Sequence, residues 1–240
     1  PLVVRSNIYD CVDWMLTSEW DDDDYSNFHA SKVNTHWHFL QFDNQSSDGV
    51  ITGFSNEQSV RPFTMLEKKT DKGLPLPLNT TFTKAAKKGE RVITVKNAAQ
   101  YHPEIEILIG ADNVGGNEVG RIKSIKGNEI TLVRPLKNDH PVKDIVTVEF
   151  VRQRFWVDSD VGTVFWHDHA LGRITWGHGG FGTMIVEPVG STYHNPKTGA
   201  PIRSGPLADI RTAEPVGYGV NGSFRELLVQ LNDSVPHTIN

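Results

Sequence analysis

Short apolar stretches rich in Val, Ile, Thr, Phe and Trp recur along the chain between Gly, Pro and Asn residues, while helical periodicity is weak. Regularly spaced short strands of this kind are typical of β-sandwiches and β-barrels. The stretches are Leu2–Val4, Cys11–Thr17, Thr35–Phe42, Val92–Val95, Ile105–Ile109, Glu129–Val133, Ile145–Phe155, Gly162–His167 and Gly182–Val186. We therefore predict an all-β fold with Greek-key connections, because Gly and Pro punctuate the strands as such connections need.

The middle of the chain has a composition of its own. Residues 67 to 147 are richer in Lys, Gly and Asn than the flanking sequence, and the Trp- and His-rich sequence resumes only around Phe155. Within this stretch two apolar runs flank Lys126-Gly127-Asn128, a pattern that predicts a β-hairpin. Because surface loops tolerate long insertions, we interpret 67–147 as a small β subdomain inserted into a host domain of residues 1–66 and 148–188.

The sequence changes again after Pro188. Residues 189 to 223 are rich in Gly, Pro and Ser and contain few apolar runs, which predicts a long surface connection. Phe224–Leu231 is apolar enough for either a helix or a strand, and its short pattern leaves both open. We interpret residues 189–240 as a linker followed by the start of a further domain.

The bulk composition narrows the functional classes. The 240-residue chain is 38% hydrophobic and 22% charged, which fits a globular protein of one or two domains. Its net charge of -5 and its scattered basic residues lack the footprint of a nucleic-acid-binding protein. No apolar run approaches the ~20 residues of a membrane helix. The sequence begins with Pro1 and shows no signal peptide, so we expect a trimmed or processed product.

Two His-x-His pairs, His36-Trp37-His38 and His167-Asp168-His169, each follow a strand-like run. On a strand, residues i and i+2 project from the same face about 6.6 Å apart. Each pair therefore presents two imidazoles together, with the middle residue on the opposite face. If the two strands are neighbours, four imidazoles converge on one patch.

Four neutral imidazoles without a cysteine thiolate suit Cu, Zn, Fe or Ni. Taken singly, a His-x-His pair is more typical of an ordinary surface or core position. Two such pairs among only ten histidines, both in aromatic strand contexts, favour a metal site. The pattern of residues leaves the identity of the metal open.

The sequence around the pairs resembles one family. His36-Trp37-His38 is followed by Asp48-Gly49, and the second pair lies within Gly162–His169 and is followed by Phe181–Pro188. This ordered set resembles the multicopper oxidases, the laccase-like proteins built from cupredoxin domains. The resemblance covers roughly residues 1–66 and 148–240. The segments HFLQFD, SDGVITGF and EQSVRPF are most similar to the sequences of large bacterial members, a group that includes manganese-oxidising enzymes.

The resemblance implies a cupredoxin-like Greek-key β-sandwich and a role for each histidine. His36 would bind the type 2 copper, while His38, His167 and His169 would bind the type 3 pair of a trinuclear cluster that reduces dioxygen to water. Asp48 would help to deliver protons, a role that suits a carboxylate beside cations and solvent. Ser47-Asp48-Gly49 is also good turn chemistry, and the two roles are compatible.

The sequence departs from the family pattern in one respect. The family uses eight histidines for the trinuclear cluster and a His-Cys-His segment that leads to a type 1 copper, and the chain has no such segment. We expect the remaining ligands and the type 1 copper from further multicopper oxidase domains, in later sequence or in another chain. The resemblance also implies an exported protein, extracellular, periplasmic or on a cell or spore surface.

Three functions stay open at this point. The first is the amino-terminal part of an oxidase that acts on a metal ion, Mn²⁺ among them, or on phenols. The second is a cupredoxin module that binds copper without turnover. The third is a zinc site of hydrolase or lyase type, in which bound water is the nucleophile.

Several other residues are candidates for metal binding or electron transfer, but ordinary structural roles suit them better. We predict that Cys11 is a small buried hydrophobe, that His178 belongs to a turn, and that the acidic run Asp21–Asp24 is a solvated loop rather than a cation site. The tryptophans suit core and sheet-edge packing better than an electron path. The remaining histidines show no chelating spacing and are predicted to be solvated; they are His29, His102, His140, His194 and His237.

Overall fold

The computed structural model describes residues 2–18, 32–43, 47–50, 58–61, 79–113, 115–170, 172–213 and 222–231. Strands dominate these residues, and the helical part is one short turn, α2 (Gly172–Thr175), continued by the 3₁₀ helix η2 (Trp176–His178). The all-β prediction is confirmed. None of the helices in the described ranges is long and apolar enough to cross a membrane.

The chain divides into two compact units. Unit 1 comprises Pro1–Leu16, Lys32–Ser59 and Arg152–Asn240, and unit 2 comprises Thr17–Ser31 and Val60–Val151. The stretch 67–147, singled out above by its composition, lies within unit 2. The later part of unit 2 extends several residues beyond that stretch on each side.

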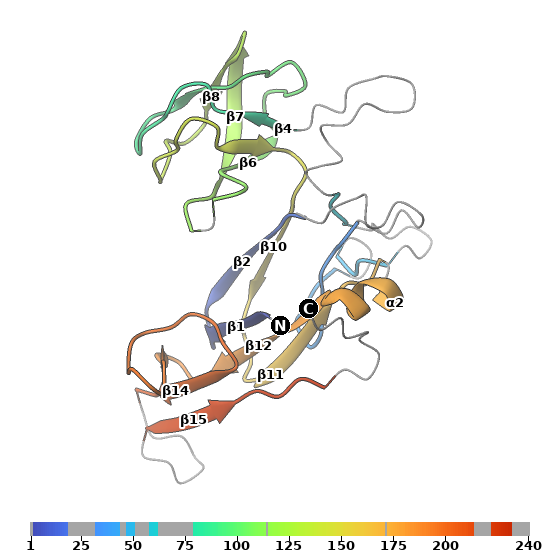
Figure 1. Cartoon of the computed structure of the whole chain (residues 1–240), viewed down its shortest axis with the longest axis vertical. Helices are drawn as coiled ribbons and strands as arrows, with labels where there is room; N and C mark the ends of the chain where they lie inside the picture. The colour runs from blue at the N-terminus through green and yellow to red at the C-terminus, as the bar shows by residue number, and fades with distance from the viewer. Residues whose placement is uncertain are drawn as a thin grey trace, which may run out of the picture. The chain divides into compact units, whose positions relative to one another are not determined.

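Unit 1 contains two sheets that form a sandwich (Figure 1). The first has the strand order β1-β12-β11-β3, with β1 parallel to β12 and the other pairs antiparallel. The second pairs β10 with β2. A parallel pair of strands from the two ends of a unit needs a crossover connection, which excludes a simple up-and-down meander. The strands are β1 (Leu2–Asn7), β2 (Cys11–Leu16), β3 (His36–Trp37), β10 (Val151–Trp156), β11 (Thr163–His167) and β12 (Phe181–Glu187).

Aromatic side chains from both sheets meet in the core of unit 1. The indole of Trp14 on β2 lies 5.1 Å from that of Trp37 and 5.7 Å from that of Trp166, and Trp37 also contacts Phe155 at 5.3 Å. Aromatic pairs at these separations stabilise a core beyond the area that they bury. The packing role predicted for the tryptophans holds for these three, whereas Trp156 is 61% exposed.

Cys11 is exposed, so the prediction that it is buried is wrong. Side chains of β2 alternate between solvent and core, as in any half-buried strand. Cys11 and Asp13 face solvent, while Val12 and Trp14 are the residues packed against the core. The apolar character of the stretch indicates a strand correctly, but Cys11 lies on its outer face.

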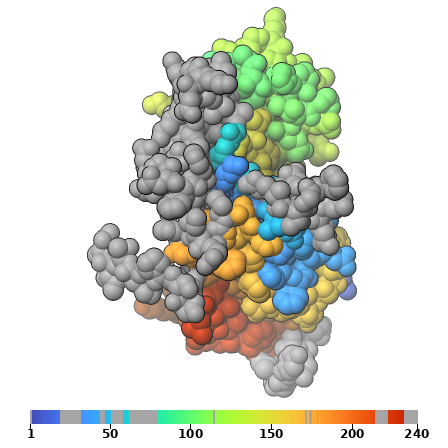
Figure 2. Space-filling view, turned by 90° about the vertical axis from the view of Figure 1, so that its right-hand side faces the viewer, coloured from blue at the N-terminus to red at the C-terminus, as the bar shows by residue number. Residues whose placement is uncertain are grey.

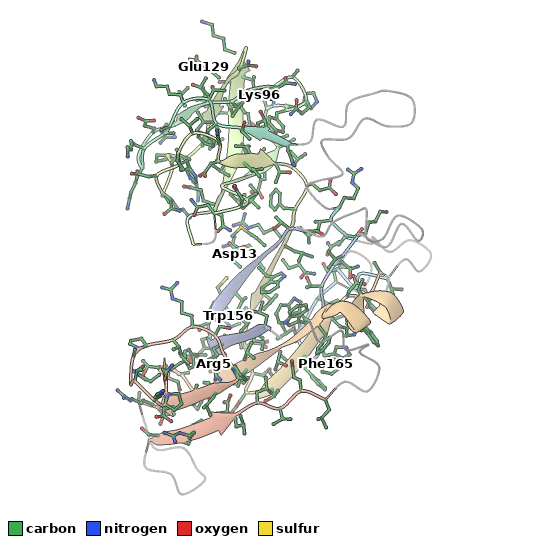
Figure 3. All side chains as sticks on the ribbon, viewed as in Figure 1. Arg5, Asp13, Lys96, Glu129, Trp156 and Phe165 are labelled. Carbon is green, nitrogen blue, oxygen red and sulfur yellow. The ribbon has the colours of Figure 1, made fainter. Side chains whose placement is uncertain are left out.

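Residues after Pro188 form a third sheet of unit 1, with the order β13-β14-β15. The strands are β13 (Thr192–His194), β14 (Leu207–Arg211) and β15 (Ser223–Leu227). The predicted surface connection is therefore wrong for this part, and Phe224–Leu231 begins as a strand. Arg5 of β1, labelled in Figure 3, ties this sheet to the sandwich, because its guanidinium donates to the Gly205 carbonyl at 3.0 Å and lies 3.0 Å from the Glu226 carboxylate.

Unit 2 is one antiparallel sheet with the order β4-β9-β6-β7-β8-β5. A bridge between Phe82 and Val95 joins the two edges, so the sheet curls around its own core. The predicted hairpin is present: β7 and β8 are joined by a two-residue loop in which Gly127 has φ +60°, as a type II′ turn requires of its first residue. The strands are β4 (Asn79–Thr81), β5 (Val92–Thr94), β6 (Glu106–Ile109), β7 (Glu118–Lys126), β8 (Glu129–Leu132) and β9 (Ile145–Thr147).

Candidate metal centre

The two His-x-His pairs lie on neighbouring antiparallel strands of unit 1. His36 of β3 is directly opposite His167 of β11, and Trp37 is opposite Trp166. Because side chains alternate along a strand, the two tryptophans enter the core and the two histidines share the other face. In Figure 2 the blue residues of the 32–43 segment accordingly lie beside the yellow and orange residues that carry the second pair.

Only the first histidine of each pair is part of a strand. β3 ends at Trp37 and β11 ends at His167, so His38 and His169 lie just beyond the strand ends. All four imidazoles nevertheless meet. The ring centroid of His36 lies 4.9 Å from that of His38, 5.3 Å from that of His167 and 4.4 Å from that of His169. One ring nitrogen each from His36, His38 and His167 falls within a 4.8 Å cluster that could hold a metal ion.

Backbone carbonyls fix the orientation of three of the imidazoles. The Nδ1–H groups of His36 and His169 both donate to the carbonyl of Asp48, at 2.8 and 3.2 Å, and that of His167 donates to the carbonyl of Asp168 at 2.9 Å. A carbonyl oxygen can only accept, so each of these Nδ1 atoms carries a proton and each Nε2 keeps its lone pair. Metal-ligating histidines have this arrangement, with the second nitrogen held by a carbonyl or carboxylate.

His38 is arranged differently. Its Nε2 lies 3.0 Å from Nε2 of His167, and its ring stacks on Phe165 with centroids 3.8 Å apart. Since Nε2 of His167 accepts, Nε2 of His38 donates in the metal-free protein. Two nitrogens bound to one metal at about 2.0–2.1 Å each would be spaced roughly 3 Å apart at a near-right angle. The pair is therefore spaced for a shared cation that would replace the proton between them.

Burial favours the neutral form of three of the imidazoles. Desolvation lowers the pKa of His36, His38 and His167 below the ordinary value of 6.5, and the positive charge that neighbouring imidazoles would carry lowers it further. The carbonyl of Asp48 opposes the shift at His36 and that of Asp168 opposes it at His167. Because only the neutral imidazole binds metal, the site is ready to accept a cation at pH 7.

Asp48 lies on the Nδ1 side of His36 and His169. Its Oδ1 is 3.6 Å from Nδ1 of His36, and its Oδ2 is 3.2 Å from Nδ1 of His169. Oδ2 also accepts from the backbone N–H of Val50 at 3.3 Å, which is turn chemistry. Asp48 with these two histidines is a second possible metal-binding group. The same Nδ1 atoms already donate to its carbonyl, however, so the Nε2 side is the better ligand face.

Two aromatic residues of the site were not predicted. Phe165 of β11, labelled in Figure 3, stacks on His38 and is 47% exposed. Trp176 contacts the ring of His167 edge-on at 4.8 Å, and its indole N–H donates to the Asp168 carbonyl at 2.7 Å. Their nearness in sequence to the second pair was the available signal. His178 belongs to η2, and its side chain is outside the described part of the chain.

The remaining histidines lie apart from the centre where the structure describes them. His102 is exposed and His194 is half-buried, in line with prediction. His140 is only 1% exposed, so the prediction of a solvated side chain is wrong; two carboxylates hold it inside unit 2. His29, His237 and Asp21–Asp24 lie outside the described residues.

Comparison with known proteins adds no family. A scan against protein-family models finds no match to this chain, and a search of the curated proteins finds none either.

Proposed function

We propose that this chain is the amino-terminal copper-binding part of a multicopper oxidase. It supplies His36, His38, His167 and His169 to a trinuclear copper cluster that reduces dioxygen to water while a metal ion, Mn²⁺ among them, or a phenol is oxidised. The observation that carries the proposal is the register of β3 and β11, which puts His36 opposite His167 and brings four imidazoles to one face. The motif resemblance selects copper among the metals that such ligands suit.

The geometry supports the assignment of ligands within the cluster. The short distance between Nε2 of His38 and Nε2 of His167 suits two ligands of one type 3 copper. The assignment of His36 to the type 2 copper rests on the motif resemblance. Bound copper would supply the one-electron steps that dioxygen reduction needs. The chain's own contribution is to orient His36, His167 and His169 through Nδ1–H bonds to carbonyls, with the ring of His38 stacked on Phe165 beside them.

Asp48 is the proposed proton relay. Its carboxylate is partly exposed and reaches the Nδ1 sides of His36 and His169, so it connects solvent with the imidazoles of the centre. A carboxylate in such a position can pass protons inward without binding the metal itself.

The cluster would be completed by other domains. The described residues bring four imidazoles together, and Cys11, on the outer face of β2, is not among the residues of the centre. We propose that further multicopper oxidase domains, in the same longer polypeptide or in another chain, contribute the other ligands and the type 1 copper. The exposed rings of Phe39 and Phe165 beside His38 provide apolar surface that such a domain could cover.

The same observation favours a second candidate, a copper-binding module without turnover. Four imidazoles with one pair of Nε2 atoms 3.0 Å apart suffice to bind copper, whereas oxidase activity needs an electron-transfer site in addition. The continuation of the gene separates the two candidates. His-Cys-His and His-Pro-x-His-x-His segments downstream would support the oxidase, and their absence from the gene and from every partner chain would support the module.

Metal analysis with electron paramagnetic resonance tests the proposal. The chain is loaded with copper and, separately, with zinc, and the wild type is compared with His38→Ala and with the control His102→Ala. We expect copper(II) bound by several imidazole nitrogens in the wild type and the control, and its loss in His38→Ala. A protein that takes only zinc, or copper binding that is equal in all three proteins, would overturn the proposal.

A further inference from the structure

A buried asparagine joins the two loops that carry the histidines. Asn34 is 1% exposed, and its side chain forms hydrogen bonds in two directions. Its amide N–H donates to the Gly49 carbonyl at 2.7 Å, and its Oδ1 accepts from the backbone N–H of His169 at 2.8 Å. One short side chain thus links the turn after Asp48 with the backbone of a ligand that is 135 residues away in sequence.

Asp168 completes this link from the other side. Asp168 lies between His167 and His169 in the sequence, and its side chain is fully buried. Oδ1 accepts from the backbone N–H of Asn34 at 2.8 Å, and Oδ2 accepts from the hydroxyl of Thr175 at 2.7 Å. A buried carboxylate is costly unless its oxygens are hydrogen-bonded, so these donors hold Asp168 and Asn34 in one arrangement.

The two residues together position the Asp48 carbonyl. Gly49 has φ +92°, and a Cβ there would lie 2.8 Å from the amide nitrogen of Asn34, so the turn packs tightly on this side chain. The preceding carbonyl, that of Asp48, is the one that receives the Nδ1–H groups of both His36 and His169. Displacement of the turn would therefore release two imidazoles at once.

We propose that Asn34 and Asp168 are positioning residues of the metal centre, which hold the Asp48 carbonyl where it sets His36 and His169 as Nδ1–H tautomers with Nε2 free. The consequence for copper rests on the proposed function, whereas the consequence for the tautomers concerns the metal-free chain alone. The hydrogen bonds of Asn34 and Asp168 described above join backbone groups and the hydroxyl of Thr175. Partners at this distance from a metal typically change its affinity 10–100-fold when they are removed.

Asn34→Asp and two variants of Asp168 separate positioning from folding. Asn34→Asp keeps the acceptor for the N–H of His169 but removes the donor to Gly49. Asp168→Asn keeps an acceptor for Asn34, and its amide can donate to the hydroxyl of Thr175, whereas Asp168→Ala loses both bonds. Asn195→Asp is the matched control, because Asn195 uses only its Oδ1, as an acceptor in an exposed turn.

The first readout is long-range ¹H–¹⁵N correlation of the imidazoles in the metal-free chain at pH 8. We expect His36 and His169 as Nδ1–H tautomers in the wild type, Asp168→Asn and Asn195→Asp. In Asn34→Asp and Asp168→Ala both rings should shift toward the Nε2–H form. Unchanged tautomers in folded Asn34→Asp would overturn the proposal, and circular dichroism identifies variants that fail to fold. If neither Asn34→Asp nor Asp168→Ala folds, Nε2–H tautomers in the wild type would overturn it.

The second readout is copper(II) affinity by competition with a chelator. We expect a 10–100-fold loss in Asn34→Asp and Asp168→Ala, and a change within about threefold in Asp168→Asn and the control. Equal affinity in all the variants would reject the positioning role. A wild type that binds no copper would reject the proposed function, while the tautomer measurement would still decide the role of Asn34 and Asp168.

Discussion

Buried histidines occur in both units, in opposite settings. In unit 2 the imidazole of His140 lies between two carboxylates, with Nδ1 2.9 Å from Asp144 and Nε2 3.1 Å from Glu118, and its ring stacks on Phe82. In unit 1 three imidazoles donate Nδ1–H to a carbonyl, which leaves the lone pair on Nε2. A histidine whose two nitrogens both meet carboxylates supports the fold, whereas one that keeps the lone pair on Nε2 is set for a cation.

The partners of His140 strengthen this contrast. Glu118 also accepts from the backbone N–H groups of Lys137 and Asn138, which hold its carboxylate in place beside the imidazole. Nε2 of His167, in contrast, faces the imidazole of His38. The difference between a structural and a ligand-binding histidine thus lies in the partner atoms, since burial is similar at His140 and His167.

The largest expected effect is on the stability of unit 2. His140→Ala removes the imidazole from between the buried carboxylates, so Asp144 loses this partner and Glu118 keeps the backbone N–H groups of Lys137 and Asn138. We expect the free energy of unfolding to fall by about 3–5 kcal/mol, with copper affinity unchanged. Urea denaturation of the variant, with a copper titration on the folded protein, measures both. A stability equal to that of the wild type would show that His140 has no structural role.

The reverse pattern is expected in unit 1. His167→Ala removes half of the Nε2 pair, so copper affinity should fall by about 100-fold, equivalent to about 2.7 kcal/mol. The unfolding free energy of the metal-free chain should fall by about 2 kcal/mol or less, because two hydrogen bonds are lost, the one to the Asp168 carbonyl and the one from His38. Chelator competition and urea denaturation on the same preparation test this. A large loss of stability with unchanged copper affinity would make His167 structural.

A third buried group sharpens the comparison through pH. Burial, reinforced by Glu226 and opposed by Arg5, raises the pKa of Glu187 from 4.5 to about 8. The folded state therefore holds a proton that the unfolded state releases, so stability is full below pH 4.5 and falls as pH rises through 8. We expect a loss on the order of 2 kcal/mol between pH 5 and 7. Glu187→Gln should remove this dependence of stability on pH, which thermal melts at several pH values measure. A variant whose stability still falls with pH as in the wild type would contradict the assignment to Glu187.

The smallest expected effect on copper belongs to Asp48. The contact that orients His36 and His169 is made by its backbone carbonyl, which Asp48→Asn retains. Copper affinity should stay within about threefold of the wild type, whereas oxygen reduction in the complete oxidase should slow because the proton relay is lost. Copper titration and oxygen consumption measure the two effects. A loss of copper equal to that of His167→Ala would make the carboxylate itself part of the binding site.

The sequence predicted what short-range patterns determine. Strand alternation placed Trp37 in the core and His36 beside the second pair, and Gly127 marked the hairpin of unit 2. The convergence of His36 and His167 needed one assumption, that their strands are neighbours. It holds because the register pairs the two residues directly.

The patterns that failed depend on distant partners. His140 is polar, and only the fold brings Glu118 and Asp144 to its two nitrogens. The sheet of β13, β14 and β15 lacks long apolar runs, since ion pairs such as Asp209 with Arg225 cover its surface. The role of the Asp48 carbonyl could not be predicted from the sequence either. Every residue has a carbonyl, and only the fold determines where each one points.

Anomalous diffraction at the copper edge from crystals grown with copper(II) tests the central claim most directly. The account predicts a copper peak about 2.0 Å from Nε2 of both His38 and His167, with Nδ1 of His167 still on the Asp168 carbonyl. A peak bound through Nδ1 of His36 and the Asp48 carboxylate, or copper only at exposed histidines such as His102, would contradict it.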